Sequence, residues 1–287
     1  MSMRPRPILV DMPLHIKQKI ARHVDFKSRY SLRGCSKQFH SIVDTSPIVY
    51  DKISIVNGES EQNWDCPGNF YGLYVSTGST RFHLKVLESQ DRLLELLEVM
   101  FKNPKAHFVK VIISALDIKL QTLLTSQKHK ISLENLTIQN SLNQEHILSV
   151  LQCLKPGVLE KLDLSIEQNI DLYQVFELEQ WKQTKSIRLY AVNMENEIIP
   201  HVLHFQKLRL VNLIHLTLEE AKKIVESALK TGKEFRSFEI KSRTSMARIE
   251  EHFGELSFFD IPDSNFALLV WCTSRRFYLK KMEKLGN

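Results

Sequence analysis

Apolar residues recur along the middle of the chain in one local pattern: apolar, two spacers, apolar, one spacer, apolar. This pattern is typical of a short buried strand, and its period indicates units that bury their apolar faces by stacking. We therefore predict an α/β fold, a leucine-rich-repeat-like solenoid of alternating strands and helices. The alternative is an ordinary α/β domain whose strands recur by chance. The first members are 25, 26, 25, 21 and 30 residues apart in the triplets Phe108/Val111/Ile113, Leu133/Leu136/Ile138, Leu159/Leu162/Leu164, Thr184/Ile187/Leu189, Phe205/Leu208/Leu210 and Phe235/Phe238/Ile240.

The segments between the triplets have the periodicity of helices. Apolar residues three and four apart indicate one helix within residues 116–124 and another within 147–154. The clearest helix is predicted over residues 217–230, because Thr217 and Glu220 form a capping box and Gly232 offers a C-terminal exit.

A β-rich first segment, residues 48–88, precedes the triplets. Residues 48–56 are rich in β-branched side chains, and residues 70–75 and 81–87 alternate as strands do, so a small antiparallel sheet is expected. A helix with one apolar face follows over residues 91–102, and Asn103-Pro104 ends it.

The N-terminal residues 12–44 predict three short helices. Asp25 and Ser36 are well placed to cap the second and third helices, and Pro47 follows the last one. A module of this size buries too little surface to be secure alone, since chains below roughly 40 residues usually need a metal, disulfides or a partner. We therefore expect another protein to complete it.

This N-terminal segment resembles an F-box. Met12 and Pro13 stand where that family has its Leu-Pro start. This segment departs from the usual residues of the family at Met12, Cys35 and Phe39. The resemblance implies docking on a small acidic Skp-type adaptor and, through it, on a cullin. The alternative is an ordinary three-helix subdomain. The expected adaptor contacts are Met12, Pro13, Leu14, Ile16, Ile20, Val24, Leu32, Lys37 and Phe39.

The remainder of the chain is similar to nematode-type F-box proteins with a C-terminal FTH domain. The similarity lies in "LENLTI", "LEKLDL", "LEQWKQTKSIRL" and "HFQKLRLVNLIHLTLEEAKKI". It implies an F-box over residues 1–47, a substrate-recognition domain over 48–287, and a non-catalytic substrate receptor of an SCF-type ubiquitin ligase. A repeat scaffold or nucleic-acid-associated protein unrelated to ubiquitin is the alternative.

The formal charge of +6 is concentrated at the N-terminus. Residues 1–47 hold nine Lys and Arg against three Asp, so the other 240 residues hold 30 basic and 30 acidic groups. This balance argues against a broad nucleic-acid-binding face on the larger domain. The positive module suits an acidic adaptor, although a solvated basic surface without a partner is equally consistent with the charge.

No catalytic or cofactor motif is recognisable. Phosphate-binding glycine loops, a G-x-S-x-G elbow and H-E-x-x-H are absent, and no cofactor is expected. His201 and His204 lack further ligands at metal spacing. The acidic group of Asp171, Glu177 and Glu179 is interpreted as a solvated helix face without a cleft.

The four cysteines are scattered, so reduced thiols are expected. The longest strongly apolar stretch, residues 266–274, is about half the length of a membrane-spanning helix. No apolar signal-peptide core follows the basic N-terminus. We expect a protein of the cytoplasm or nucleus that has no membrane partner.

Side-chain alternation along strands predicts where a protein substrate binds. The residue between the second and third members of each triplet must point away from the core. These residues form one row across the sheet, and Arg188 and Arg209 are its strongest candidates because arginine is enriched at interfaces. An inert polar face, or the loop around Trp64, is the alternative. The row contains Ile112 and the predicted substrate-binding residues Thr137, Asp163, Arg188, Arg209 and Glu239.

Overall fold

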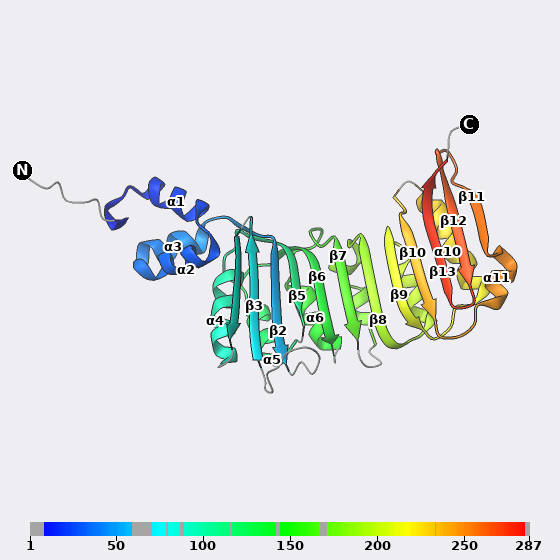
Figure 1. The fold of residues 1–287 in the computed structure, drawn as a ribbon, viewed down its shortest axis with the longest axis horizontal. Coiled ribbons are helices and arrows are strands. Elements are labelled where there is room, and N and C mark those ends of the chain that lie inside the picture. Colours follow the sequence, from blue (N-terminus) through cyan, green and yellow to red (C-terminus); the bar gives the residue numbers. More distant parts are fainter. Residues whose placement is uncertain are drawn as a thin grey trace, which may run out of the picture. The chain divides into compact units, whose positions relative to one another are not determined.

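The computed structural model (Figure 1) divides the chain into two compact units. One unit comprises Met1–Asn135 with Cys153–Lys155, and the other Leu136–Gln152 with Pro156–Asn287. Both combine strands and helices, so the fold class is α/β as predicted. The predicted loop around Trp64 lies outside the described residues, which are 9–58, 70–78, 80–86, 89–114, 116–141, 144–166, 171–232 and 234–284.

The first unit begins with the three predicted helices. They are α1 (Leu14–His23), α2 (Phe26–Cys35) and α3 (Lys37–Thr45), preceded by the 3-10 turn η1 (Leu9–Asp11). The Asp25 carboxylate accepts the Ser28 N–H at 2.7 Å, and the Ser36 hydroxyl accepts the Phe39 N–H at 3.2 Å. Both predicted caps are therefore confirmed.

The sheet of the first unit has the order β5-β2-β3-β4. Strands β2, β3 and β4 pair antiparallel, as predicted, whereas β1 and β2 both run parallel to β5. Helix α4 ends before Asn103, as predicted, because Pro104 cannot continue it. The elements are β1 (Ile48–Tyr50), β2 (Lys52–Gly58), β3 (Phe70–Thr77), β4 (Thr80–Val86), α4 (Gln90–Phe101), β5 (Ala106–Ile113), α5 (Ile118–Thr125) and the beginning of β6 (Ser132–Ser141).

Aromatic packing joins the three helices to this sheet. The Tyr50 ring stacks on Phe108 of β5 at 5.1 Å between centroids and meets Phe26 of α2 edge-on at 6.2 Å. The Asn103 side chain, itself buried, donates to the Ser46 carbonyl at 2.8 Å. The N-terminal module is thus packed onto the first strands rather than tethered to them.

The second unit alternates helices with parallel strands and then turns antiparallel. Its pairing order is β7-β8-β9-β10-β13-β12-β11, parallel from β7 to β10 and antiparallel after it. The elements are α6 (Gln144–Cys153), β7 (Lys161–Ile166), α7 (Tyr173–Phe176), α8 (Glu179–Lys182), β8 (Ser186–Met194), η2 (Asn196–Ile198), α9 (Ile199–Val202), β9 (Lys207–Leu213), α10 (Leu218–Thr231), β10 (Ser237–Ser242), α11 (Ala247–Phe253), β11 (Leu256–Asp260), β12 (Phe266–Thr273) and β13 (Arg276–Glu283).

All eighteen members of the predicted triplets are buried, none being more than 3% exposed. Thr184 is the one polar member, and its hydroxyl donates to the Gln180 carbonyl at 2.6 Å. This bond removes the cost of burying the hydroxyl. The predicted alternation of strand and helix is confirmed, and so is the capping box of Thr217 and Glu220 on α10.

The antiparallel strands β11, β12 and β13 were not predicted. The apolar residues 266–274 belong almost entirely to β12, whose Leu268, Val270 and Cys272 side chains are buried. Figure 1 shows α10 and α11 on one side of these strands. Phe253 of α11 lies 6.0 Å from Phe277 of β13 between ring centroids, so the residues next to Phe277 point to the opposite side. We call that side of β7 to β13 the open face. Among the described residues, no helix is long and apolar enough to span a membrane.

Candidate protein-binding surfaces

The buried side chain of Arg29 holds the N-terminal module together. It is 3% exposed, and its guanidinium donates to the carbonyls of Ala21 at 2.6 Å, Ser46 at 3.0 Å and Val43 at 3.2 Å. These carbonyls belong to the last turns of α1 and α3, where a helix leaves acceptors without partners. Burial lowers the pKa of Arg29, but an arginine in a protein stays charged. The guanidinium therefore ties the ends of two helices to the third.

A second arginine fixes α2 against α3. Arg33 Nε lies 2.7 Å from Asp44 Oδ1, and Arg33 Nη2 lies 3.2 Å from Asp44 Oδ2, which is a bidentate pair. One cluster of buried apolar side chains in the module consists of Ala21, Ile42 and Val43, with Leu32 packed against them. The hydrogen bonds of Arg29 and Arg33 add to this packing.

The nine predicted adaptor residues have different degrees of exposure. Pro13, Leu14 and Lys37 are exposed, and Leu14 is 51% exposed although it is apolar. Phe39 is fully buried and lies under the Lys17 ammonium, 5.9 Å from the ring centroid. Phe39 thus supports the module in this structure, and its part in adaptor contact stays a prediction. The half-buried members are Met12, Ile16, Ile20, Val24 and Leu32.

The surface charge of the module is smaller than its formal charge. Lys17 and Arg29 are buried, and Arg33 is paired with Asp44. The Lys17 ammonium donates to Gln38 at 2.6 Å. Arg4 and Arg6 lie outside the described residues. The exposed cations on the three helices are Lys19, Arg22, Lys27 and Lys37.

Four members of the predicted row lie side by side on adjacent strands of the second unit. The strand register places Asp163 opposite Arg188, Arg188 opposite Arg209, and Arg209 opposite Glu239. All four side chains are half-buried, as is Thr137 on β6. Ile112, in the first unit, pairs with Ser54 of β2. Whether the row binds a substrate stays a prediction.

Ion pairs run along this row. Arg188 Nε lies 3.5 Å from Asp163, and Arg209 Nε lies 3.2 Å from Glu239. The Asp163 Oδ1 and Arg209 Nε atoms are nevertheless buried without a hydrogen bond of suitable geometry among the described residues. The pairs are therefore close in distance but leave hydrogen-bonding capacity unused.

The same row continues into strands that the sequence did not predict. Opposite Glu239 stands Tyr278, opposite Tyr278 stands Trp271, and opposite Trp271 stands Leu256. The row thus changes from charged to apolar across the open face. The short continuous apolar run of residues 266–272 was the sequence signal that could have indicated a strand here.

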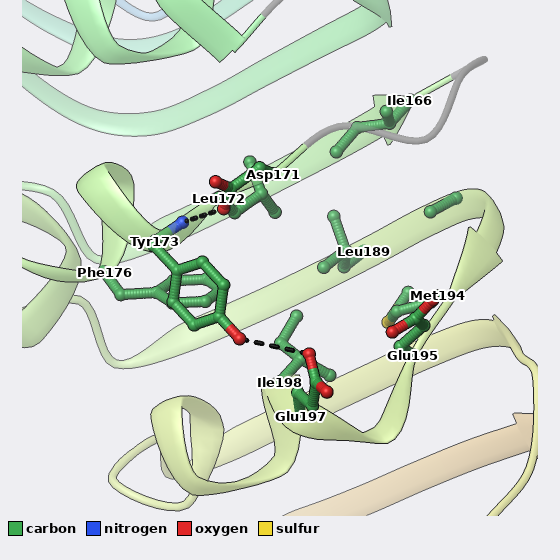
Figure 2. A pocket seen from close by; sticks show the side chains of 11 residues that line it. Ile166, Asp171, Leu172, Tyr173, Phe176, Leu189, Met194, Glu195, Glu197 and Ile198 are labelled. Carbon is green, nitrogen blue, oxygen red and sulfur yellow. Dashed lines mark hydrogen bonds between the residues drawn. The ribbon is translucent and has the colours of Figure 1, made fainter.

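A cavity of about 270 Å³ lies at the carboxyl ends of β7 and β8 (Figure 2). The Tyr173 hydroxyl at its rim donates to Glu197 at 3.1 Å, a bond that raises the Tyr173 pKa. The expectation that no cleft lies beside the acidic group was wrong for Asp171. Glu177 and Glu179 point elsewhere, to Lys182 and Gln183. The lining consists of Ile166, Asp171, Leu172, Tyr173, Phe176, Leu189, Ala191, Met194, Glu195, Glu197 and Ile198.

The described lining of this cavity contains no Ser, Cys, His or Lys, and its ionisable side chains are Asp171, Tyr173, Glu195 and Glu197. Both histidines make ring contacts: the His201 ring stacks on Phe176 at 4.5 Å between centroids, and the His204 ring lies 4.0 Å from that of Phe205. Burial lowers the His204 pKa. Within the described part of the chain, no group of three or more His, Cys, Asp or Glu could hold a metal.

Two domain families match the chain. The FTH domain matches residues 86–258, which is more than half of the 287 residues, and the F-box domain matches residues 9–50. No match was found among curated proteins or among solved structures.

Proposed function

Because the chain belongs to the FTH domain family and carries an F-box domain ahead of it, we propose that it is the substrate-recognition subunit of an SCF-type E3 ubiquitin ligase. Both resemblances predicted from the sequence are confirmed. An F-box indicates binding of an SCF-type adaptor, and an FTH domain is consistent with a substrate-binding part. The contribution of such a subunit is proximity: it holds the substrate near a charged ubiquitin-conjugating enzyme and raises the effective concentration.

The F-box match is the observation that carries this proposal, and the surface of α1 supports it. Leu14 projects an apolar side chain that is 51% exposed, beside the exposed Pro13. The exposed cations of the module would complement an acidic adaptor and speed its encounter. We propose that α1 forms the centre of the adaptor contact and that the adaptor connects the chain to a cullin.

Adaptor binding by full-length variants tests the proposal. Deleting residues 1–47 would remove Phe26, which packs edge-on against the Tyr50 ring, so a point substitution is cleaner. Burying a leucine contributes about 1.5–3 kcal/mol, so Leu14→Asp should weaken adaptor binding about tenfold or more. Titration of immobilised Skp-type adaptor with each purified protein measures this.

Ile118→Asp is the matched control, because Ile118 is 72% exposed on α5, outside the F-box. It should bind like the native chain. The double variant Ile16→Asp/Ile20→Asp should bind more weakly still, but both residues are half-buried, so its helicity must be checked by circular dichroism. Failure of the native chain to bind any Skp-type adaptor would favour the repeat-scaffold alternative.

We further propose that the open face of the second unit holds the substrate. The residues expected to take part are Asp163, Arg188, Arg209 and Glu239 on this face and Thr137 on the neighbouring strand β6. Support comes from the matched register of the first four and from the unused hydrogen-bonding capacity of Asp163 and Arg209.

A further inference from the structure

One end of the open face carries an apolar patch that is unusually exposed. Phe258 is 61% exposed and Leu256 is 55% exposed, both on the edge strand β11. The register places Leu269 opposite Phe258 and Trp271 opposite Leu256. Neighbouring apolar side chains that stay exposed commonly mark sites where another molecule binds. We call Leu256, Phe258, Leu269, Trp271 and Tyr278 the apolar patch.

A positively charged strip borders this patch on the same face. The outward side chains of β9, β10 and β13 include five cations and one carboxylate, Glu239. Glu239 is shared by Arg209 at 3.2 Å, Lys241 at 3.7 Å and Arg276 at 3.9 Å. We call Lys207, Arg209, Lys241, Arg276 and Lys280 the basic strip.

The basic strip has more positive charge than the face itself can neutralise. Lys207 and Lys280 are exposed, and no ion-pair partner is found for them among the described residues. They occupy one row, because both lie opposite Ser237. A ligand carboxylate above Ser237 would thus meet a cation on either side. The neutral overall composition of residues 48–287 conceals this local excess.

Along a row of paired residues that crosses the strands, cationic side chains give way to apolar ones. From β9 to β11, one row reads Lys207, Ser237, Lys280, Leu269 and Phe258. Strands lie about 4.8 Å apart, so five strands span about 19 Å, which is the length of about six extended residues at about 3.3 Å each. A short extended segment lying across the strands can therefore cover the basic strip and the apolar patch together.

We infer that the open face binds a short extended protein segment that is acidic at one end and bears large apolar side chains at the other. The acidic end lies over the basic strip, and the apolar end lies over the apolar patch. This inference rests on the proposed function in one respect: it takes the segment to belong to the substrate. Nucleic acid would satisfy the cations but would leave Leu256 and Phe258 uncovered.

Defined peptides test this binding mode on the full-length chain. The probe is a fluorescein-labelled eight-residue peptide with four glutamates followed by leucine and phenylalanine residues, measured by anisotropy at about 0.1 M salt. Its comparison peptide has lysine in place of each glutamate. We expect saturable binding of the acidic peptide, at least tenfold weaker binding of the basic one, and weakening as salt rises.

Two variants separate the two halves of the site. Lys207→Glu/Lys280→Glu should weaken acidic-peptide binding at least tenfold, and Leu256→Ser/Phe258→Ser should do so with little change in salt dependence. The controls are Lys223→Glu on α10 and Ile118→Ser on α5, both exposed and both on helices rather than on the strands of the open face. All four altered residues are exposed, so thermal melting should stay near native.

Several outcomes would overturn the inference. Binding of both peptides alike, unchanged binding by either double variant, or tighter binding of a single-stranded RNA that displaces the peptide would each do so. Sedimentation showing a dimer that Leu256→Ser/Phe258→Ser dissociates would assign the patch to a second copy. Adaptor titration of the same variants separates the two proposals: peptide binding without adaptor binding removes the ligase function, and the reverse removes only this inference.

Discussion

Arginine side chains serve opposite purposes in the F-box and on the open face. In the F-box, Arg29 is 3% exposed, and its guanidinium donates hydrogen bonds to backbone carbonyls. On the open face, the side chains of Arg188 and Arg209 are 38% and 32% exposed and pair with carboxylates of neighbouring strands, and the Arg209 guanidinium also lies 5.9 Å from the centroid of the Tyr190 ring.

The backbone explains this difference. Helices leave the carbonyls of their last turns without partners. A guanidinium between helix ends therefore donates its N–H groups to these carbonyls and has none left for a ligand. In a sheet, the neighbouring strands already pair the backbone acceptors, so an arginine above the sheet keeps donors for a ligand. The same residue type is therefore structural in one region and available for binding in the other.

Removing Arg29 should produce the largest effect. Arg29→Met keeps the apolar stem but leaves the carbonyls of Ala21, Val43 and Ser46 without a donor, at about 1–3 kcal/mol for each buried unsatisfied group. We expect a loss of about 3 kcal/mol or more in the free energy of unfolding of the module, measured by urea denaturation followed by circular dichroism. Arg29→Lys should recover only part of it, because an ammonium lacks the planar fork.

Arg22→Met on α1 is the control for this loss, since Arg22 is exposed. It should unfold at nearly the native urea concentration. Equal midpoints for Arg29→Met and Arg22→Met would show that the hydrogen bonds of Arg29 contribute no net stability, and the contrast between the two regions would then fail.

Thiol reactivity compares the solvent protection of the two regions. Cys35 of α2 is exposed, whereas Cys272 of β12 is buried, and that burial, with Glu250 nearby, raises the pKa of Cys272 to about 11. At pH 8 only about one Cys272 thiol in a thousand is then ionised, and the thiolate is the reactive form. We expect iodoacetamide to modify Cys35 at least a hundredfold faster, as followed by peptide mass spectrometry.

The raised pKa of Cys272 fixes how its contribution to stability changes with pH. The folded state raises the pKa of Cys272 above its ordinary value of 9.0, so its contribution to stability is intact below about pH 9 and is lost as the pH rises towards about 11. Because the thiolate is the reactive form and its fraction rises tenfold per pH unit below the pKa, Cys272 modification should accelerate about tenfold for each pH unit between 7 and 9. Comparable rates for Cys35 and Cys272 at pH 8 would mean that the C-terminal strands open readily.

Charge reversal on the open face tests the substrate row. Arg188→Glu/Arg209→Glu replaces two cations by carboxylates beside Asp163 and Glu239, so an acidic segment should bind at least tenfold more weakly. Adaptor affinity should stay native, because both residues lie outside the F-box. Peptide anisotropy and adaptor titration of one protein preparation measure both.

Retention of acidic-peptide binding by this double variant would move recognition to the Lys207 and Lys280 row alone. If the double variant still bound every substrate, recognition would lie elsewhere on the chain. Lys182→Glu/Lys185→Glu is a control of equal charge change on exposed residues outside the row.

Much of the fold was predictable because its signals are local. Side-chain alternation identified the triplets, all of which are buried, and capping chemistry identified the starts of α2, α3 and α10. Such signals need only neighbouring residues. The register of Asp163, Arg188, Arg209 and Glu239 also followed, because equal spacing within each triplet keeps parallel strands aligned.

What was missed depends on contacts distant in sequence. Nothing near Arg29 indicates that its partners would be carbonyls 8 to 17 residues away. The antiparallel return of β13 onto β10 ended the parallel repeat, and it brought Tyr278 and Trp271 into the predicted row. The apolar patch could not be foreseen without that pairing.

The smallest expected effect comes from exchanging the two charges of one ion pair. Arg209 and Glu239 lie directly opposite on β9 and β10, and Arg209→Glu alone would set two carboxylates opposite each other. An opposite-charge pair on neighbouring strands stabilises a sheet by roughly 0.2–1 kcal/mol, and like charges directly opposite each other destabilise it. Arg209→Glu should therefore lower the free energy of unfolding by up to about 1 kcal/mol, while Arg209→Glu/Glu239→Arg should regain only part of it in a double-mutant cycle, because Glu239 also pairs with Lys241 and Arg276. Peptide binding need not return with stability, because the exchange moves the cation to β10, next to Lys241 and Arg276. Recovery of stability without recovery of acidic-peptide binding would show that Arg209 acts on the ligand from its own strand. Recovery of both would mean that only the total charge of the open face matters.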